Sequence, residues 1–384
     1  MKHLVSLVFV AWMAAHAATN GAEVEMPAGT YVLSDDGNFF GRLTVTRTGE
    51  FTGMLRDSFD DAQYGMRVFA GRLSFGGEVD CLLRYPQATY YHPFGPHESL
   101  TIRHTPDGPT EYAATMKVTY GNRIGPPSIF TYDLLAYRIL NDPAAAGQYT
   151  LLFRPVPGTG YGVAPDGTGW AVLRLSSTGS FRCVGKLANG ESFSFGFDAR
   201  ADRRLDLFRF QSPATFYPRK GGKLHTVFNG TIVLRDVPDI SDADGVMQWE
   251  DPVTLDEEFL TEVSIIASRY VPTRNAGSLL SADAVPRPKL GVASFSDASF
   301  PEPKRAMFRF EVPPMLLPES TQLMPKLSWK IQGGAFPGRF HGIVQPGAGT
   351  RAFSGVFFSK QRTAEGFFLK RGGSGVVRLE VKDD

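Results

Sequence analysis

The short turn phrase Thr-Gly-x-Phe or Pro-Gly-x-Phe occurs three times in the chain, and it constrains the fold more than any other feature. It stands as TGEF at residues 48–51, as TGSF at 178–181 and inside PGRFHG at 337–342. Apolar and polar residues alternate around the first two copies, which gives each flanking strand one buried face. Because glycine readily adopts positive φ in a tight turn, the pattern predicts β-hairpins. The predicted turn glycines are Gly49, Gly179 and Gly338.

Longer phrases repeat around these hairpins. AGTYVL at 28–33 precedes the first turn as AGQYTLLF at 146–153 precedes the second, and VFAGRLSF at 68–75 matches VFNGTIVL at 227–234. Short strands separated by glycine turns are typical of antiparallel meanders, and their recurrence indicates repeated modules. We therefore predict an all-β fold of repeated antiparallel meander modules, built as small barrels or sandwiches.

The repeats divide the chain into three predicted β-modules, at residues 18–142, 143–253 and 254–384. Within the first module, residues 79–140 fit the repeat poorly. The segment 254–270, TLDEEFLTEVSIIASRY, opens like a capped helix with a helical apolar spacing, yet its β-branched VSII and the following proline are typical of a strand. We favour a strand, with the helix as the alternative.

The first 17 residues have the pattern of a secretory signal peptide. A basic start is followed by the apolar run LVSLVFVAWMAA and by the small-x-small site AHA at 15–17. This apolar run is shorter than the ~20 residues that span a bilayer, so we expect no transmembrane helix. The expected location is secreted, periplasmic or at the cell surface.

The charge balance bears on the partner. The chain has 40 Lys and Arg against 39 Asp and Glu, and removing residues 1–17 takes away only Lys2, leaving 39 of each. Neutralising phosphates requires a clear basic excess, so we expect no nucleic-acid partner.

The two cysteines, Cys81 and Cys183, are too few for a disulfide scaffold. In an exported chain they have two interpretations. Either they form one disulfide, which would close a loop of about a hundred residues and stabilise the fold by roughly 4–5 kcal/mol, or they are two small buried apolar residues.

Residues 147–384, and 28–78 less closely, resemble a class of uncharacterised exported bacterial proteins built from glycine- and aromatic-rich β-repeats. The resemblance rests on turn-and-strand phrases such as KGGKLHTVFNGTIVL, LSWKIQGGAFPGRFHGIV and FSGVFFSKQRTAEGFFLKRGGSGVVRL. It implies secretion and an all-β, barrel-like architecture, and it brings no catalytic residues.

Motifs for catalysis and cofactors are missing from the sequence. There is no Gly-x-Ser-x-Gly elbow and no His-Glu-x-x-His pair, and the glycine-rich insert at 154–167 lacks the spacing of a dinucleotide loop. We interpret that insert as a plain insertion loop. We therefore predict no cofactor and no catalytic residue, and lean against an enzyme.

Two acidic clusters are weak alternatives. Asp242 and Asp244 occupy two positions of a calcium loop, but Ile240 stands at its first position and helical flanks are missing. Asp57, Asp60 and Asp61 contain the carboxylate pair that a glycosidase needs, with nothing in the sequence to orient it. We interpret both clusters as solvated turns, so no metal site is predicted.

The best candidates for ligand contact lie in the atypical part of the first module. The stretch RYPQATYYHPFGPHESL places aromatic rings among prolines, and such rings offer rigid contact area at little entropic cost. These residues are Tyr85, Tyr90, Tyr91, His92 and Phe94. Trp170, Trp249 and Trp329, near strand ends in the repeats, are expected in the core.

Taken together, the sequence favours an exported, non-catalytic β-repeat protein with a structural role in the cell envelope or a binding role towards a glycan or a surface protein. Two alternatives stay open: a secreted hydrolase with an unrecognised carboxylate site, and an outer-membrane-associated barrel. The sequence leaves the oligomeric state open.

Overall fold

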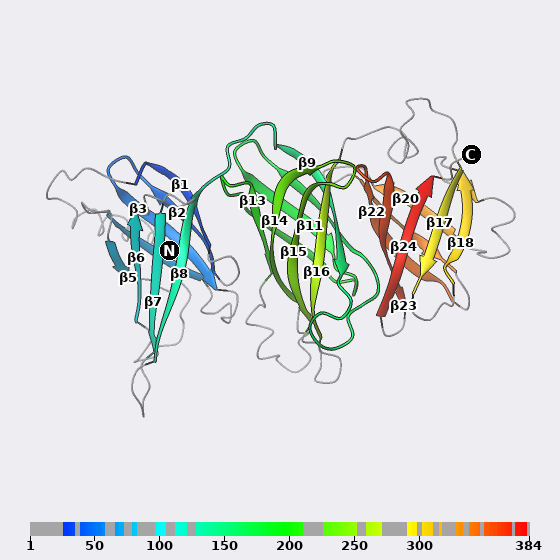
Figure 1. Cartoon of the computed structure of the whole chain (residues 1–384), viewed down its shortest axis with the longest axis horizontal. Coiled ribbons are helices and arrows are strands. Elements are labelled where there is room, and N and C mark those ends of the chain that lie inside the picture. Colours follow the sequence, from blue (N-terminus) through cyan, green and yellow to red (C-terminus); the bar gives the residue numbers. More distant parts are fainter. Residues whose placement is uncertain are drawn as a thin grey trace, which may run out of the picture. The chain divides into compact units, whose positions relative to one another are not determined.

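The computed structural model of the chain describes residues 26–34, 39–57, 66–72, 79–82, 97–104, 112–120, 128–209, 226–251, 259–270, 290–297, 302–309, 315–316, 327–332, 338–345, 349–370 and 373–381. All helical or extended elements in these ranges are β-strands, so the predicted all-β class is confirmed. The strands form three antiparallel sheets of eight strands each (Figure 1). The described residues form no helix that is long and apolar enough to span a bilayer.

The three sheets use consecutive strands. The first contains β1 (Gly29–Ser34), β2 (Phe39–Val45), β3 (Glu50–Asp57), β4 (Met66–Arg72), β5 (Val79–Leu82), β6 (His97–His104), β7 (Tyr112–Tyr120) and β8 (Ser128–Arg138). The second contains β9 (Gly147–Pro155), β10 (Gly169–Leu175), β11 (Ser180–Lys186), β12 (Ser192–Asp198), β13 (Arg204–Arg209), β14 (Val227–Val237), β15 (Ser241–Asp251) and β16 (Phe259–Arg269). The third contains β17 (Leu290–Ser296), β18 (Lys304–Arg309), β19 (Met315–Leu316), β20 (Leu327–Gln332), β21 (Arg339–Val344), β22 (Arg351–Phe358), β23 (Thr363–Lys370) and β24 (Gly373–Val381).

Each sheet is a meander whose first strand also pairs with its last. β1 pairs with β8, β9 with β16 and β17 with β24, so each sheet is broken in its middle, at β4/β5, β12/β13 or β19/β20. The first sheet lies in one compact unit, and the second and third sheets lie together in another. Within the ambiguous segment 254–270, the described residues Phe259–Arg269 form the strand β16 of the second sheet. The predicted division after residue 253 precedes this last strand of the sheet.

The first two Gly-x-Phe phrases form the same turn. The Gly49 amide donates to the Thr46 carbonyl at 3.1 Å, and the Gly179 amide donates to the Ser176 carbonyl at 3.1 Å. Their φ angles are 78° and 84°, in the left-handed region that closes a three-residue hairpin loop. Gly338, with φ 87°, precedes β21, and a Cβ there would lie 2.9 Å from the Tyr270 ring.

A tyrosine marks the start of the first two sheets. Tyr31 on β1 donates its hydroxyl proton to the Pro27 carbonyl at 2.7 Å, and Tyr149 on β9 donates to the Ala145 carbonyl, also at 2.7 Å. Burial raises the pKa of Tyr149, which keeps this proton in place for donation. The shared bond shows that the phrases AGTYVL and AGQYTLLF build the same local structure.

Phenylalanine rings cover glycines on neighbouring strands. At Gly53 a Cβ would lie 2.2 Å from the Phe69 ring, and at Gly375 it would lie 2.4 Å from the Phe368 ring. Glycine leaves room for the ring to lie against the backbone, an arrangement that offsets the packing a glycine lacks. The composition, with 41 Gly and 30 Phe, reflects this arrangement. The directly opposed pairs in which a Cβ on the glycine would meet the ring include Phe51–Gly71, Phe69–Gly53, Phe193–Gly185, Phe340–Gly355 and Phe368–Gly375.

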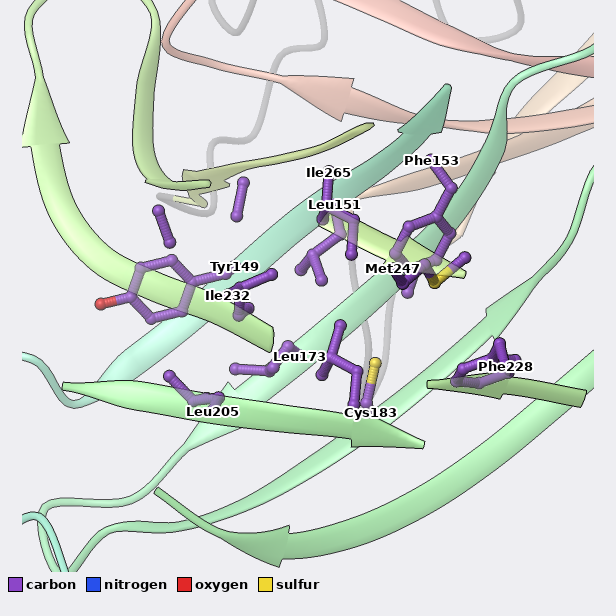
Figure 2. Close-up of a cluster of buried hydrophobic side chains, with 14 of the residues drawn as sticks. Tyr149, Leu151, Phe153, Leu173, Cys183, Leu205, Phe228, Ile232, Met247 and Ile265 are labelled. Atoms are coloured by element: carbon purple, nitrogen blue, oxygen red, sulfur yellow. The ribbon is translucent and has the colours of Figure 1, made fainter. Parts of the chain in front are cut away.

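The second sheet curls around a packed apolar core, and we call it the second barrel (Figure 2). All eight of its strands contribute side chains to one buried cluster, as an eight-stranded wall with a filled interior requires. No ladder joins β12 to β13; there the Phe208 ring lies 5.8 Å from Phe195 and 5.3 Å from Phe197, centroid to centroid. Aromatic contacts therefore close the part of the wall that lacks backbone hydrogen bonds.

The third sheet has a core of its own on one face. Rings at its centre include Phe295, Phe353 and Phe368, which pack edge to face with centroids 5.6 and 5.9 Å apart from Phe295. Tyr270, which follows the last strand of the second barrel, belongs to this cluster. The second barrel therefore contributes a side chain to the core of the third sheet.

Candidate functional site

The second barrel and the third sheet meet through their outer faces, and we call this contact the joint. Its apolar centre combines strands β9, β10, β22 and β23, and all six of its central side chains are buried. Trp170 on β10 donates its indole proton to the Ser354 hydroxyl on β22 at 3.0 Å. The Arg339 guanidinium lies 5.9 Å from the indole ring, and burial lowers its pKa. The six side chains are Leu152, Trp170, Val172, Val356, Phe358 and Phe367.

An ion pair with a buried carboxylate lies beside this apolar centre. Arg154 on β9 donates from Nε and Nη2 to the two carboxylate oxygens of Glu365 on β23, at 3.0 and 2.8 Å. Thr168 donates its hydroxyl proton to the same carboxylate at 2.6 Å. The Glu365 side chain is 7% exposed, so three donors replace the water that burial removes. Protein donors thus hold both carboxylate oxygens.

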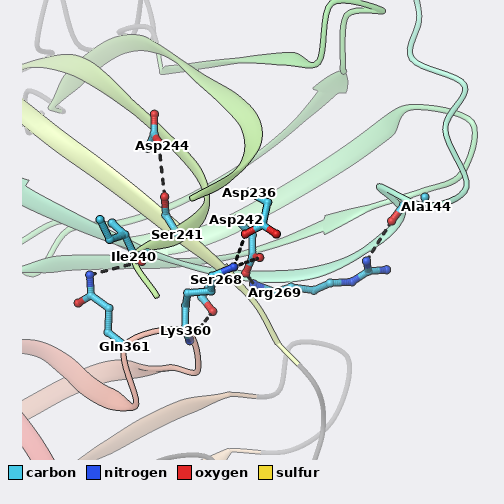
Figure 3. Close-up of polar contacts among 10 residues, drawn as sticks. All are labelled: Ala144, Asp236, Ile240, Ser241, Asp242, Asp244, Ser268, Arg269, Lys360 and Gln361. Carbon is cyan, nitrogen blue, oxygen red and sulfur yellow. Dashed lines mark hydrogen bonds and ion pairs between the residues drawn. The ribbon is translucent and has the colours of Figure 1, made fainter. Parts of the chain in front are cut away.

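The turn between β22 and β23 contacts the second barrel at a second polar cluster (Figure 3). The Lys360 ammonium forms ion pairs with Asp236 and with Asp242, the latter at 3.1 Å. The Lys360 amide donates to the Ser268 hydroxyl at 2.9 Å, and the Gln361 side chain donates to the Ile240 carbonyl at 3.4 Å. The hydrogen bond to Asp236 raises the pKa of Lys360, which therefore stays charged.

Asp242 and Asp244, the residues considered for calcium, both have protein partners. Asp242 also accepts a hydrogen bond from the Arg269 amide at 2.7 Å. Asp244 accepts from Arg235 Nε at 2.8 Å, a contact that raises the pKa of Arg235. Within the described ranges, no three His, Cys, Asp or Glu side chains converge in a way that could hold a metal ion. Asp242 is thus a residue of the joint.

The glycine-rich loop between β9 and β10, residues 156–168, is held against β16 of its own barrel. The Val156 amide donates to the Glu262 carbonyl at 2.8 Å, and Tyr161 exchanges two backbone hydrogen bonds with Leu260, each 3.0 Å long. Close approach requires glycine here, because a Cβ on Gly160 would lie 1.9 Å from the Leu260 carbonyl oxygen. The loop is therefore bound along β16, and it exposes 49% of Tyr161 and 91% of Val163.

The other residues singled out in the sequence have different outcomes. Cys183 is a free, fully buried thiol inside the second barrel, so the considered disulfide with Cys81 is not formed; burial raises the pKa of this thiol and keeps it neutral. Trp249 is buried against Phe259 with ring centroids 4.9 Å apart. Two groups of candidates lie outside the described residues: Asp60 and Asp61, and the aromatic set Tyr85, Tyr90, Tyr91, His92 and Phe94.

Sequence reasoning missed the residues that build the joint. Arg154 and Glu365 are 211 positions apart, and no local pattern links them. A signal for the apolar part was present, because TLLF, WAVL, GVFF and GFFL are continuous apolar runs, which indicate strands buried on both faces.

No protein-family model matches the chain, and no curated protein matches it. Among solved structures, a protein of unknown function of the DUF3598 family from Nostoc punctiforme is 10% identical, with 63% of this chain and 96% of that one covered and a TM-score of 0.21. A variant of transferrin binding protein B from Haemophilus parasuis is 11% identical, with coverages of 94% and 77% and a TM-score of 0.19. An endo-1,5-alpha-L-arabinanase from Thermotoga petrophila is 9% identical, with coverages of 93% and 100% and a TM-score of 0.19. At these values the likenesses carry no argument about activity, ligand or partner.

Proposed function

We propose that this chain is an exported, non-catalytic β-repeat protein that serves recognition or structure at the cell envelope. The observation that carries the proposal is the filled interior of the second barrel, to which every strand contributes buried apolar side chains. An eight-stranded barrel filled in this way leaves its loops and outer faces as the surfaces for a partner.

The buried carboxylates of the joint support the non-catalytic part of the proposal. Glu365 faces Arg154, and Asp297 faces Lys370 at 3.4 Å and Arg351 at 3.6 Å. Each of these carboxylates is paired with a cation of the protein. Their chemistry is that of structural ion pairs.

The partner that we propose is a glycan or a surface protein. The aromatic set from Tyr85 to Phe94 remains the proposed contact, because rings stiffened by neighbouring prolines suit stacking on sugars or on protein surfaces. The signal peptide at residues 1–17 is the basis for the proposed export.

A glycan and polysaccharide array, run with a hydrolysis assay on the same panel, tests the proposal. We expect binding without turnover, lost in the Tyr90→Ala/Tyr91→Ala double variant and kept in Tyr161→Ala, which removes an exposed tyrosine of the β9–β10 loop. Turnover of any substrate would overturn the non-catalytic reading and favour the hydrolase alternative. Binding that survives the double variant but is lost in Tyr161→Ala would move the contact to that loop.

A further inference from the structure

The β9–β10 loop has two kinds of attachment, and the first is to its own barrel. Near its start, Thr159 accepts a hydrogen bond from the Glu262 amide at 2.9 Å through its hydroxyl oxygen. The Thr159 hydroxyl also donates to the Val156 carbonyl at 2.8 Å, which closes the loop locally. Together with the Tyr161–Leu260 backbone pair, these bonds fix residues 156–161 along β16.

The second attachment is to the third sheet, through three consecutive residues. Asp166 lies 3.5 Å from the Lys370 ammonium. The Gly167 amide donates to the hydroxyl of Ser374, a fully buried residue, at 3.1 Å. Thr168 donates to the Glu365 carboxylate at 2.6 Å. One short segment therefore connects both bodies of the joint.

We propose that residues 156–168 are a strap that locks the third sheet onto the second barrel, and that seating of residues 166–168 is the step that closes it. The proposal concerns the conformation of the joint and is independent of any ligand. It assigns a role to an insert whose sequence predicts a plain loop.

The close packing of Gly167 allows one substitution to disrupt the contact of the strap with the third sheet. A Cβ on Gly167 would lie 2.6 Å from the Ser374 hydroxyl oxygen, 2.7 Å from Phe367 Cβ and 3.1 Å from the Gly375 carbonyl oxygen. The Ser374 hydroxyl can rotate away, but Phe367 Cβ is fixed by its own strand. Gly167→Ala is therefore incompatible with the contact that residues 166–168 make with the third sheet.

Gly158→Ala is the matched control. It lies in the same strap, and a Cβ there has no atom within 4 Å. Its φ is +77°, so alanine strains the backbone of the strap but leaves the contact of residues 166–168 with the third sheet unchanged. The two variants share the chemical change and differ in the contact with the third sheet.

Hydrogen exchange of the full chain, followed by mass spectrometry, tests the strap at a distant point of the joint. The reporter is the Lys360 amide, which donates to the Ser268 hydroxyl. We expect Gly167→Ala to speed its exchange about tenfold or more, and Gly158→Ala to leave it near the parent rate. The β11 ladder should keep its protection in both variants.

Equal protection of the Lys360 amide in the parent and in a folded Gly167→Ala protein would overturn the proposal. Should that variant fail to fold, Thr168→Val supplies the test, since it removes the hydroxyl bond to Glu365 and keeps the side-chain shape. Faster Lys360 exchange in Thr168→Val supports the strap, and unchanged exchange contradicts it.

Discussion

The outer faces of two equivalent strand pairs differ sharply. β9 and β10 are the first two strands of the second sheet, as β17 and β18 are of the third. On the inward face, Phe153 on β9 lies opposite Ile265 on β16, and Phe295 on β17 lies opposite Val377 on β24. Inward positions are apolar in both. On the outward face, the pair Leu152–Trp170 of the second barrel is buried by the third sheet. The pair Ser294–Arg305 of the third sheet is polar and lies beside the half-buried pair Val292–Met307.

The inward residues therefore form the core that holds each sheet together, whereas the outward residues decide whether the other face packs against a second sheet or faces solvent. A strand with both faces apolar lies between two cores, and a strand that alternates lies between a core and solvent. Polar outer faces also limit further stacking of repeated modules, as they do at the ends of repeat arrays. The Ser294–Arg305 pair has this polar character.

The largest expected effect comes from the centre of the buried face. Trp170→Ala should lower the free energy of unfolding of the unit that contains the joint by about 3–5 kcal/mol, because it removes a buried ring and leaves a cavity. Arg305→Ala, at the equivalent exposed position, should change it by less than about 0.5 kcal/mol. Urea unfolding curves with equal slopes measure both, and similar losses would break the comparison.

Charges should follow the same rule with a smaller effect. Glu365→Gln should cost about 1–3 kcal/mol, since it weakens a buried carboxylate held by three donors. Asp244→Asn should cost at most about 1 kcal/mol, because its partner Arg235 has a 62% exposed side chain. A cost for Asp244→Asn that equals or exceeds that of Glu365→Gln, in the same unfolding assay, would contradict the expected difference between a buried and an exposed carboxylate pair.

The exposed face can be converted into the buried type. A Ser294→Leu/Arg305→Trp double variant should fold with its stability changed by less than about 0.5 kcal/mol, because both side chains point outward. It should also gain self-association, since it creates an apolar patch. Sedimentation velocity over a range of concentrations measures this gain, and the Arg305→Ala protein is the control. A double variant that sediments like this control would show that outer-face composition does not govern association.

The smallest effect concerns pH. The pKa of Lys360 is raised above 10.5 by the hydrogen bond to Asp236, so its contribution to stability is complete below that value and is lost as pH rises through the folded-state pKa. The difference in urea midpoint between the parent and Lys360→Met should therefore shrink above pH 10.5. A difference that stays constant through this range would mean that the ammonium charge does not stabilise the joint.

The sequence predicted those features that depend on neighbours along the chain. Alternation and a glycine predict the hairpins at Gly49 and Gly179, because a turn needs only local residues. The Arg154–Glu365 pair and the seat of Gly167 could not be predicted in this way, since their partners come from another sheet and register there decides the contact. The aromatic set from Tyr85 to Phe94 stays a prediction.

The opposed glycine and phenylalanine residues have a consequence for how the chain avoids misfolding. Sliding a strand by one position would send each ring to the other face of the sheet, and a slip of two would place it over a neighbour that has a side chain, except where Phe368 would meet Gly373. The pairs therefore penalise wrong alignments as well as stabilising the native one. Strand register is thus checked at each of these pairs by the fit of one ring over one bare stretch of backbone.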